Sequence, residues 1–260
     1  MLVYALGMLS LLLINFVSAG KVDGRTPVLV LDLDGTLYED DMLIETQIRD
    51  NCHIWGKDFD LTPDRCQEMH EKYGSTIFGV LQELNQPFAE TVTEYYNRVY
   101  PFMDMRRLRK YSFTGSTDDS GYSHNSHDGD LLRSLHDFPC EIVIASNSPI
   151  FHVKRCLTRL GIANLNVSAF ITPERVGGIL KTDERFWKPL FDLYPKDSYQ
   201  CTLIDDNGLN IEIVRSLGMH AHQITPTSGL KSCLLKFLGI FPSSNDAFQF
   251  DEAKYLKAKN

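Results

Sequence analysis

Four short apolar runs constrain the fold of this 260-residue chain more than any other feature. They cover residues 28–33, 141–145, 202–204 and 220–224, and they alternate with helical patterns. Runs of this length are typical of strands buried on both faces, so they predict an α/β fold with a parallel sheet and helices on both sides. More than a hundred residues separate the first two runs, too many for one crossover helix. A second, mostly helical domain is therefore expected between them.

The inserted segment carries the signals of several helices. Apolar residues recur at helical spacing after residue 41. Thr62, Pro63 and Asp64 then provide an N-cap, a first-turn proline and a first-turn acid. The expected helices cover residues 41–56, 63–73, 77–84 and 88–99. We therefore place a helical domain at residues 41–104, inside an α/β core formed by residues 20–40 and 105–241.

The two ends of the chain differ from this core. Residues 9–17 are almost wholly apolar and lead into Val17-Ser18-Ala19, a small-x-small pattern that predicts a signal peptide over residues 1–19. The expected location is the secretory pathway or outside the cell, with the cytoplasm as the alternative. No stable membrane span is expected once the leader is removed. Residues 242–260 are polar and predict a weakly ordered tail.

Charge and cysteine content restrict the partners and the chemistry. A formal charge of −8 opposes binding to a nucleic-acid polymer, which requires a basic surface to displace counterions. The six cysteines form no CxxC pattern, so we expect them to be small buried hydrophobic residues. An anionic substrate would therefore have to be attracted by local features, such as a metal ion.

Two carboxylates one residue apart, Asp32 and Asp34, follow the first apolar run. Residues i and i+2 of a strand lie on the same face, and Gly35 predicts that the strand breaks directly after them. This edge of an open α/β sheet is where ligands bind. An ordinary Asp-Gly turn is the alternative, but a turn needs one Asp and leaves a buried charge on Asp32 unexplained.

Polar groups also follow the second apolar run. Ser146 and Asn147 precede a helical pattern, and a hydroxyl with free N–H groups at a helix start forms an anion site. Further along, Lys188 opens another helix, where it could place a compact positive charge on phosphate oxygens and on a nucleophile. Taken alone, an ordinary surface lysine is the favoured alternative at this position.

The third run ends in adjacent acids, Asp205 and Asp206, with Asn210 one helical turn later. Adjacent acids at the end of an apolar strand are costly without a cation. Oxygen-only ligands suit Mg²⁺, which binds through one or two carboxylates together with phosphate. The sequence therefore predicts a magnesium site on the same rim of the sheet as the other polar groups.

This ordered set of groups resembles the haloacid dehalogenase (HAD) superfamily, mainly phosphotransfer enzymes on a Rossmann-like core, over residues 28 to about 223. Within that superfamily the chain resembles the pyrimidine 5′-nucleotidase branch, and the helical insertion is similar to the C1 cap. The segments that carry the resemblance are Asp32-Leu33-Asp34-Gly35-Thr36-Leu37-Tyr38, Arg155-Cys156-Leu157, Leu160-Gly161-Ile162-Ala163, Lys181-Thr182-Asp183 ahead of Lys188-Pro189, and Ile204-Asp205-Asp206 with Asn210.

The resemblance implies a Mg²⁺-dependent phosphatase that acts on a small phosphorylated molecule. It makes Asp32 the nucleophile that carries an aspartyl-phosphate, and Asp34 the group that protonates the leaving oxygen. The implied metal ligands are Asp32, the backbone carbonyl of Asp34, and Asp206, with Asp205 and Asn210 close by as a ligand or as support for one. The implied phosphate-binding groups are Ser146, the backbone of Asn147, and Lys188.

The nucleotidase branch implies a nucleoside monophosphate as the substrate, and a sugar phosphate or another small phosphoester is the alternative. A signalling receiver domain also combines acids, a hydroxyl and a lysine around a phosphorylated Asp, but it would have about half this length. An inactive binding protein on the same scaffold is disfavoured because all the chemical groups are retained.

Overall fold

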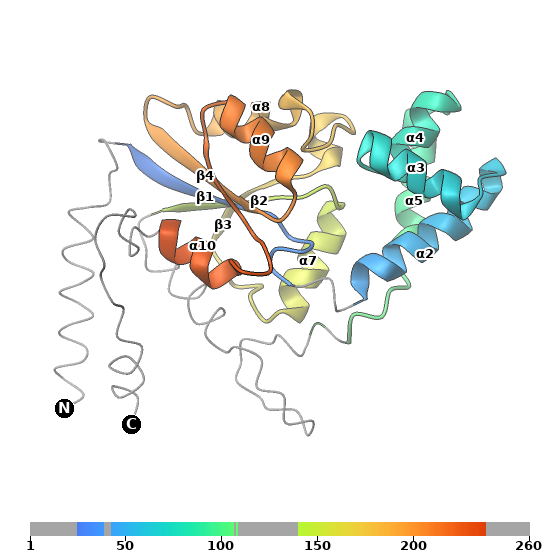
Figure 1. Cartoon of the computed structure of the whole chain (residues 1–260), viewed down its shortest axis with the longest axis horizontal. Coiled ribbons are helices and arrows are strands. Elements are labelled where there is room, and N and C mark those ends of the chain that lie inside the picture. The colour runs from blue at the N-terminus through green and yellow to red at the C-terminus, as the bar shows by residue number, and fades with distance from the viewer. Residues whose placement is uncertain (1–24, 39–42, 107, 109–139, 238–260) are drawn as a thin grey trace, which may run out of the picture.

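A computed structural model of the chain describes residues 25–38, 43–106, 108 and 140–237. In this part of the chain, five strands form one parallel sheet in the order β3-β2-β1-β4-β5. The strands are β1 (Thr26–Leu31), β2 (Glu141–Ala145), β3 (Val167–Ile171), β4 (Tyr199–Asp205) and β5 (His220–Gln223). The predicted α/β fold is confirmed (Figure 1). The predicted leader and tail lie outside the described residues.

Side chains of β1 alternate between two apolar cores. Leu29 and Leu31 face one core, which α7 and α10 cover, whereas Val28 and Val30 face the other, which α8 and α9 cover. The covering helices are α7 (Ile150–Arg159), α8 (Lys188–Leu193), α9 (Gly208–Ser216) and α10 (Leu230–Phe237). Because both faces of the strand are buried, its sequence is continuously apolar rather than alternating.

The sequence analysis missed strand β3, which lies at one edge of the sheet. Ser168 is exposed, and Val167 and Phe170 are only half-buried. An edge strand with one flank open to solvent needs no continuous apolar run, so the pattern that identified the other strands is absent here.

The strand order reverses at β1. From β1 the chain passes to β2 and β3 on one side, and then returns to β4 and β5 on the other. The ends of β1 and β4 lie together, since the backbone N–H of Asp32 donates to the carbonyl of Ile204 at 3.0 Å. In open α/β sheets ligands bind at the carboxyl ends of the strands beside such a reversal.

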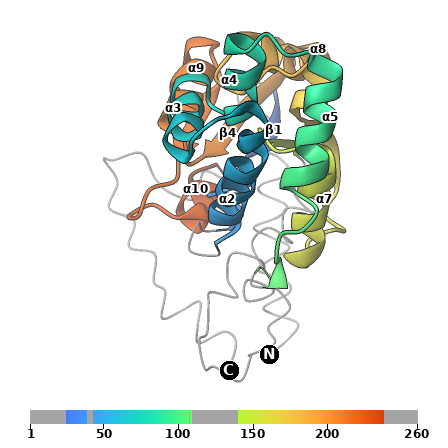
Figure 2. The same cartoon turned by 90° about the vertical axis from the view of Figure 1, so that its right-hand side faces the viewer.

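Among the described residues between β1 and β2, four α-helices pack on one another beside the carboxyl ends of the strands (Figures 1 and 2). They are α2 (Ile44–Gly56), α3 (Pro63–Tyr73), α4 (Thr76–Glu83) and α5 (Phe88–Val99), close to the predicted ranges. The side chain of Thr62 accepts a hydrogen bond from the N–H of Arg65 at 3.2 Å, which confirms the predicted N-cap. The domain boundaries at residues 41 and 104 stay predictions.

All six cysteines are free, and five of them are buried, as expected for small hydrophobic residues. Among the described helices, none combines the length and the apolar composition needed to cross a membrane.

The close packing of α4 on α3 predicts the effect of one substitution, Gly79→Ala. A Cβ atom at position 79 would lie 2.4 Å from Cβ and 2.5 Å from Cγ of Met69. Alanine favours a helix over glycine by about 1 kcal/mol. Overpacking costs about 1 to 3 kcal/mol and should dominate, because Cβ of Met69 cannot yield unless α3 moves. We expect Gly79→Ala to lower the thermal unfolding temperature.

Gly208→Ala in α9 is the matched control. The nearest atom to a Cβ there, Nε2 of Gln223, would be 3.4 Å away, which is an ordinary contact. This variant should unfold at the wild-type temperature or slightly above it. Equal unfolding temperatures for the two variants would contradict the tight contact between α3 and α4.

Candidate active site

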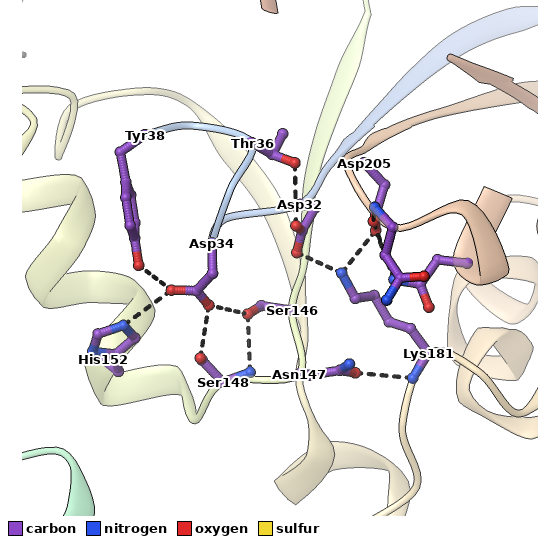
Figure 3. A network of polar contacts seen from close by, with 12 residues as sticks. Asp32, Asp34, Thr36, Tyr38, Ser146, Asn147, Ser148, His152, Lys181 and Asp205 are labelled. Carbon is purple, nitrogen blue, oxygen red and sulfur yellow. Dashed lines mark hydrogen bonds and ion pairs between the residues drawn. The ribbon is translucent and has the colours of Figure 1, made fainter. Parts of the chain in front are cut away.

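Asp32 lies at the carboxyl end of β1 and is only 3% exposed. Its Oδ1 accepts a hydrogen bond from Nζ of Lys181 at 2.5 Å, and its Oδ2 accepts one from the hydroxyl of Thr36 at 3.2 Å (Figure 3). Both carboxylate oxygens are therefore held in place by the protein.

Gly35 makes the turn that follows Asp32 and Asp34. Its φ of +74° lies in the left-handed region, which favours glycine. A Cβ atom at this position would also lie 2.4 Å from Oδ2 of Asp206. Glycine thus permits both the predicted break in the strand and the close approach of an acid from the end of β4.

Lys181 is the buried cation of the site. Its Nζ lies 2.5 Å from Oδ1 of Asp32 and 2.8 Å from Oδ2 of Asp205. Its backbone N–H donates to Oδ1 of Asn147, and its carbonyl accepts from Nε1 of Trp187, both at 2.9 Å. Burial alone would lower the pKa of Lys181, but Asp205 and Asp32 outweigh it and raise the pKa above its usual value. The ammonium group therefore stays charged.

The position of Lys181 corrects the prediction made for Lys188. Lys188 opens α8 as predicted, but it is exposed and does not line the cavity described below. Phe186 and Trp187, which precede it, are fully buried in the core, so the first residue of α8 emerges on the solvent side. Lys181, seven residues earlier, occupies the place expected for Lys188.

Asp34 points to a different set of partners from Asp32 (Figure 3). Its Oδ2 accepts from the hydroxyl of Ser148 at 2.7 Å and more weakly from that of Ser146 at 3.5 Å. Its Oδ1 accepts from the hydroxyl of Tyr38 and lies 3.3 Å from Nε2 of His152. Burial would raise the pKa of Asp34, but the contacts with His152, Tyr38 and Ser148 lower it to about 2. Asp34 is therefore anionic in this arrangement.

Asp205 and Asp206 differ although they are adjacent. Asp205 is fully buried, and Nδ2 of Asn210 donates to both of its oxygens at 3.1 Å. Its Oδ1 also accepts from the backbone N–H of Asn207 at 2.8 Å. Asp206 is exposed at the mouth of the site. Asp205 thus supports Lys181, whereas the carboxylate of Asp206 is the more accessible of the two.

The charges of this cluster suit a divalent cation. Carboxylate oxygens of Asp32, Asp205 and Asp206 all lie within 4.8 Å of one another. Burial raises the pKa of Asp32 well above its usual value, Lys181 opposes this rise, and the neighbouring acids add to it. Although Asp206 as a residue is exposed, its carboxylate lies beside the other acids, and partial loss of solvent together with the charge of Asp205 raises its pKa to about 6. One ammonium group does not balance these acids, and their hard oxygen ligands are those that Mg²⁺ prefers.

A cavity of about 330 Å³ lies between this rim and the helices α2, α3 and α5. That volume is in the range of small-molecule sites. At this rim the cavity is lined by Asp32, Asp34, Asn147, Ser148, Lys181, Asp206, Asn207 and Asn210. Ser146 is completely buried behind Ser148, whose N–H donates to the hydroxyl of Ser146 at 3.0 Å. Ser148, which the sequence analysis did not select, is therefore nearer to a ligand than Ser146.

No protein-family model and no curated protein matches the sequence. Solved structures with a similar fold include one described as a predicted phosphatase from Clostridium acetobutylicum, with a TM-score of 0.50 and 18% identity over 83% of this chain and 91% of that chain. A HAD-like hydrolase from Streptococcus pneumoniae has a TM-score of 0.47 and 13% identity over 83% of this chain and 92% of that one. A HAD family enzyme from Bacteroides thetaiotaomicron, in complex with magnesium and inorganic phosphate, has a TM-score of 0.43 and 16% identity over 78% and 95%.

The two lysines should differ in their effect on stability. Lys181→Met leaves Asp32 and Asp205 buried without a cation, and removing one partner of a buried ion pair costs about 3 to 5 kcal/mol. Lys188→Met removes an exposed side chain and should change the free energy of unfolding by less than about 0.5 kcal/mol. Urea unfolding at neutral pH without metal measures both. Equal stability of the two variants would contradict the assignment of Lys181 as the buried cation.

Proposed function

We propose that the protein is a Mg²⁺-dependent phosphatase that hydrolyses a small phosphomonoester through an aspartyl-phosphate on Asp32. The observation that supports this most is the convergence of Asp32, Lys181 and Asp206 at the mouth of one cavity. A nucleophile, a fixed cation and an accessible acid are the groups that phosphoryl transfer requires.

In the first step, a carboxylate oxygen of Asp32 attacks phosphorus. The bond between that oxygen and phosphorus forms as the bond between phosphorus and the ester oxygen breaks. Lys181 orients the attacking carboxylate from 2.5 Å and reduces its repulsion from the phosphoryl anion. The backbone N–H of Lys181 donates to the side-chain oxygen of Asn147, which fixes the lysine in place. Lys181 therefore needs little movement when the substrate binds.

Asp34 acts as the general acid in the first step and as the general base in the second. It gives a proton to the leaving oxygen, and later takes one from the water that attacks phosphorus and releases Asp32 with inorganic phosphate. A phosphoryl dianion beside Asp34 would raise the pKa of Asp34 by charge repulsion. The pKa would also rise if the hydroxyl of Ser148 donated its hydrogen bond to the substrate instead of to Asp34. Substrate binding would therefore favour protonation of Asp34. General acid–base catalysis of this kind contributes about 10² to 10⁴ in rate.

The residues that would hold Mg²⁺ are Asp32, Asp206 and the backbone carbonyl of Asp34, with Asp205 and Asn210 as their support. When bound, the ion would neutralise charge on the phosphoryl oxygens and on the carboxylates. Ser148, the hydroxyl of Ser146 and the backbone of Asn147 would hold the transferring phosphoryl group together with Lys181.

A nucleoside monophosphate is the substrate that we favour, on the resemblance to the pyrimidine 5′-nucleotidase branch. Tyr95 and Tyr100 are among the residues that line the cavity, and aromatic surfaces suit a nucleobase. A sugar phosphate or another small phosphoester is the alternative, because the same catalytic groups would act on any small monoester.

Replacing the nucleophile should abolish turnover. Asp32→Asn keeps the size and one acceptor oxygen of the side chain but removes the attacking carboxylate, so kcat should fall by at least roughly a thousandfold. Phosphate release measures this, with far-UV circular dichroism to check the fold. Asp192→Asn, at an exposed position in α8, is the control and should keep wild-type activity. Substantial turnover by Asp32→Asn would refute the nucleophile assignment.

Metal removal and a substrate panel test the rest of the proposal. Phosphate release should vanish in EDTA and return with Mg²⁺, because without the ion the negative charges of the carboxylates and of the substrate are not balanced. Turnover that resists EDTA would contradict the metal requirement.

The substrate panel should contain UMP, CMP, purine nucleotides and sugar phosphates. Preference for the pyrimidine nucleotides supports the nucleotidase proposal, and preference for a sugar phosphate supports the alternative.

A further inference from the structure

One end of the cavity is lined mainly by α2 and α3. Five residues of α2 line the cavity at the spacing of a single helix face: Glu45, Ile48, Arg49, Cys52 and His53. The first of them, Glu45, is close enough for its charge to act on Tyr38, the partner of Asp34. Because an α-helix rises about 1.5 Å per residue, Arg49 lies roughly 6 Å further along α2 than Glu45.

Arg49 differs from the other cations near the site in having no side-chain hydrogen bond or ion pair with any described residue. Lys181 also lines the cavity but is bound to Asp32 and Asp205. Within the described ranges, Arg49 makes no side-chain hydrogen bond or ion pair, even with Glu45 one turn earlier. The other arginines of helices α2 to α5 are paired: Arg65 binds Glu68 and Glu83, and Arg98 binds Asp58 and Glu94.

The surroundings of Arg49 are also rich in hydrogen-bond donors. His53, one turn further along α2, and His70 of α3 line the same end of the cavity. Neither imidazole makes a side-chain hydrogen bond to a residue in the described part of the chain. A ligand that reached this end would therefore meet N–H groups that no residue in the described part of the chain binds.

We propose that Arg49 is a specificity-determining residue that binds oxygen acceptors on the leaving group of the substrate. This inference rests on the proposed phosphatase function, since the leaving group must fill the cavity when its phosphoryl group is at Asp32. A guanidinium group presents parallel N–H donors that match two oxygen atoms. The acceptors are either the two oxygens of a carboxylate or a single carbonyl oxygen of a nucleobase, which would use one of these donors.

Two matched pairs of substrates separate these sources. Phenyl phosphate and 4-carboxyphenyl phosphate differ by one carboxylate, whereas ribose 5-phosphate and UMP differ by the base. KM and kcat in Mg²⁺ should be measured for the wild type, Arg49→Gln and Lys57→Gln. Lys57 is the control because it is exposed beside α2, does not line the cavity, and carries the same charge.

We expect Arg49→Gln to raise KM about tenfold or more for UMP or for 4-carboxyphenyl phosphate, because the lost hydrogen bonds involve a charged donor. The substrate that responds identifies the source of the acceptors. KM for phenyl phosphate and ribose 5-phosphate should stay within about twofold of the wild type, and Lys57→Gln should change no value beyond this range.

Two results would overturn the inference and leave the phosphatase function intact. One is an unchanged KM for both acceptor-bearing substrates in Arg49→Gln, and the other is an equal rise for all four substrates, which would indicate a structural effect. Absence of Mg²⁺-dependent hydrolysis of all four substrates by the wild type would count against the proposed function itself, and the inference would fall with it.

Discussion

The ammonium group of Lys181, buried between the carboxylates of Asp32 and Asp205, is the interaction on which the site depends. The two acids belong to β1 and β4, and they meet because the strand order reverses between these neighbours. Buried carboxylates without a cation would be strongly destabilising. Asn147 and Trp187 hold the backbone of Lys181 on either side, so the cation is fixed by the fold rather than drawn in by charge alone.

The same arrangement shifts the pKa values of Asp32 and Asp34, which belong to one turn, in opposite directions. Burial and neighbouring acids raise the pKa of Asp32, whereas hydrogen bonds from His152, Tyr38 and Ser148 lower the pKa of Asp34. Opposed environments of this kind commonly separate the roles of paired carboxylates. The proposed chemistry needs these two pKa values in the reverse order, so that Asp32 is charged and Asp34 is protonated. A divalent cation would favour the first change and a phosphoryl dianion the second, so activity would require both ligands together.

Sequence patterns predicted the parts of the protein that depend on local or periodic signals. The buried strands, the helices between β1 and β2, and the acids at the strand ends follow from apolar runs and from turn residues. The exposed edge strand β3 lacks that signal. The choice of Lys188 over Lys181 failed because a Lys-Pro helix start is a local feature, whereas the burial of Lys181 depends on contacts with Asn147 and Trp187. The contact of His152 with Asp34 depends on side-chain direction, which no spacing in the sequence reveals.

The most direct test of the account is chemical trapping of the phosphorylated residue. Borohydride reduces an acyl phosphate but not a free carboxylate, so quenching the protein during turnover with borohydride should convert Asp32 to homoserine. Peptide mass spectrometry would locate the change. The account predicts reduction at position 32 and not at positions 34, 205 or 206. Reduction at another acid, or none while phosphate is being released, would contradict it.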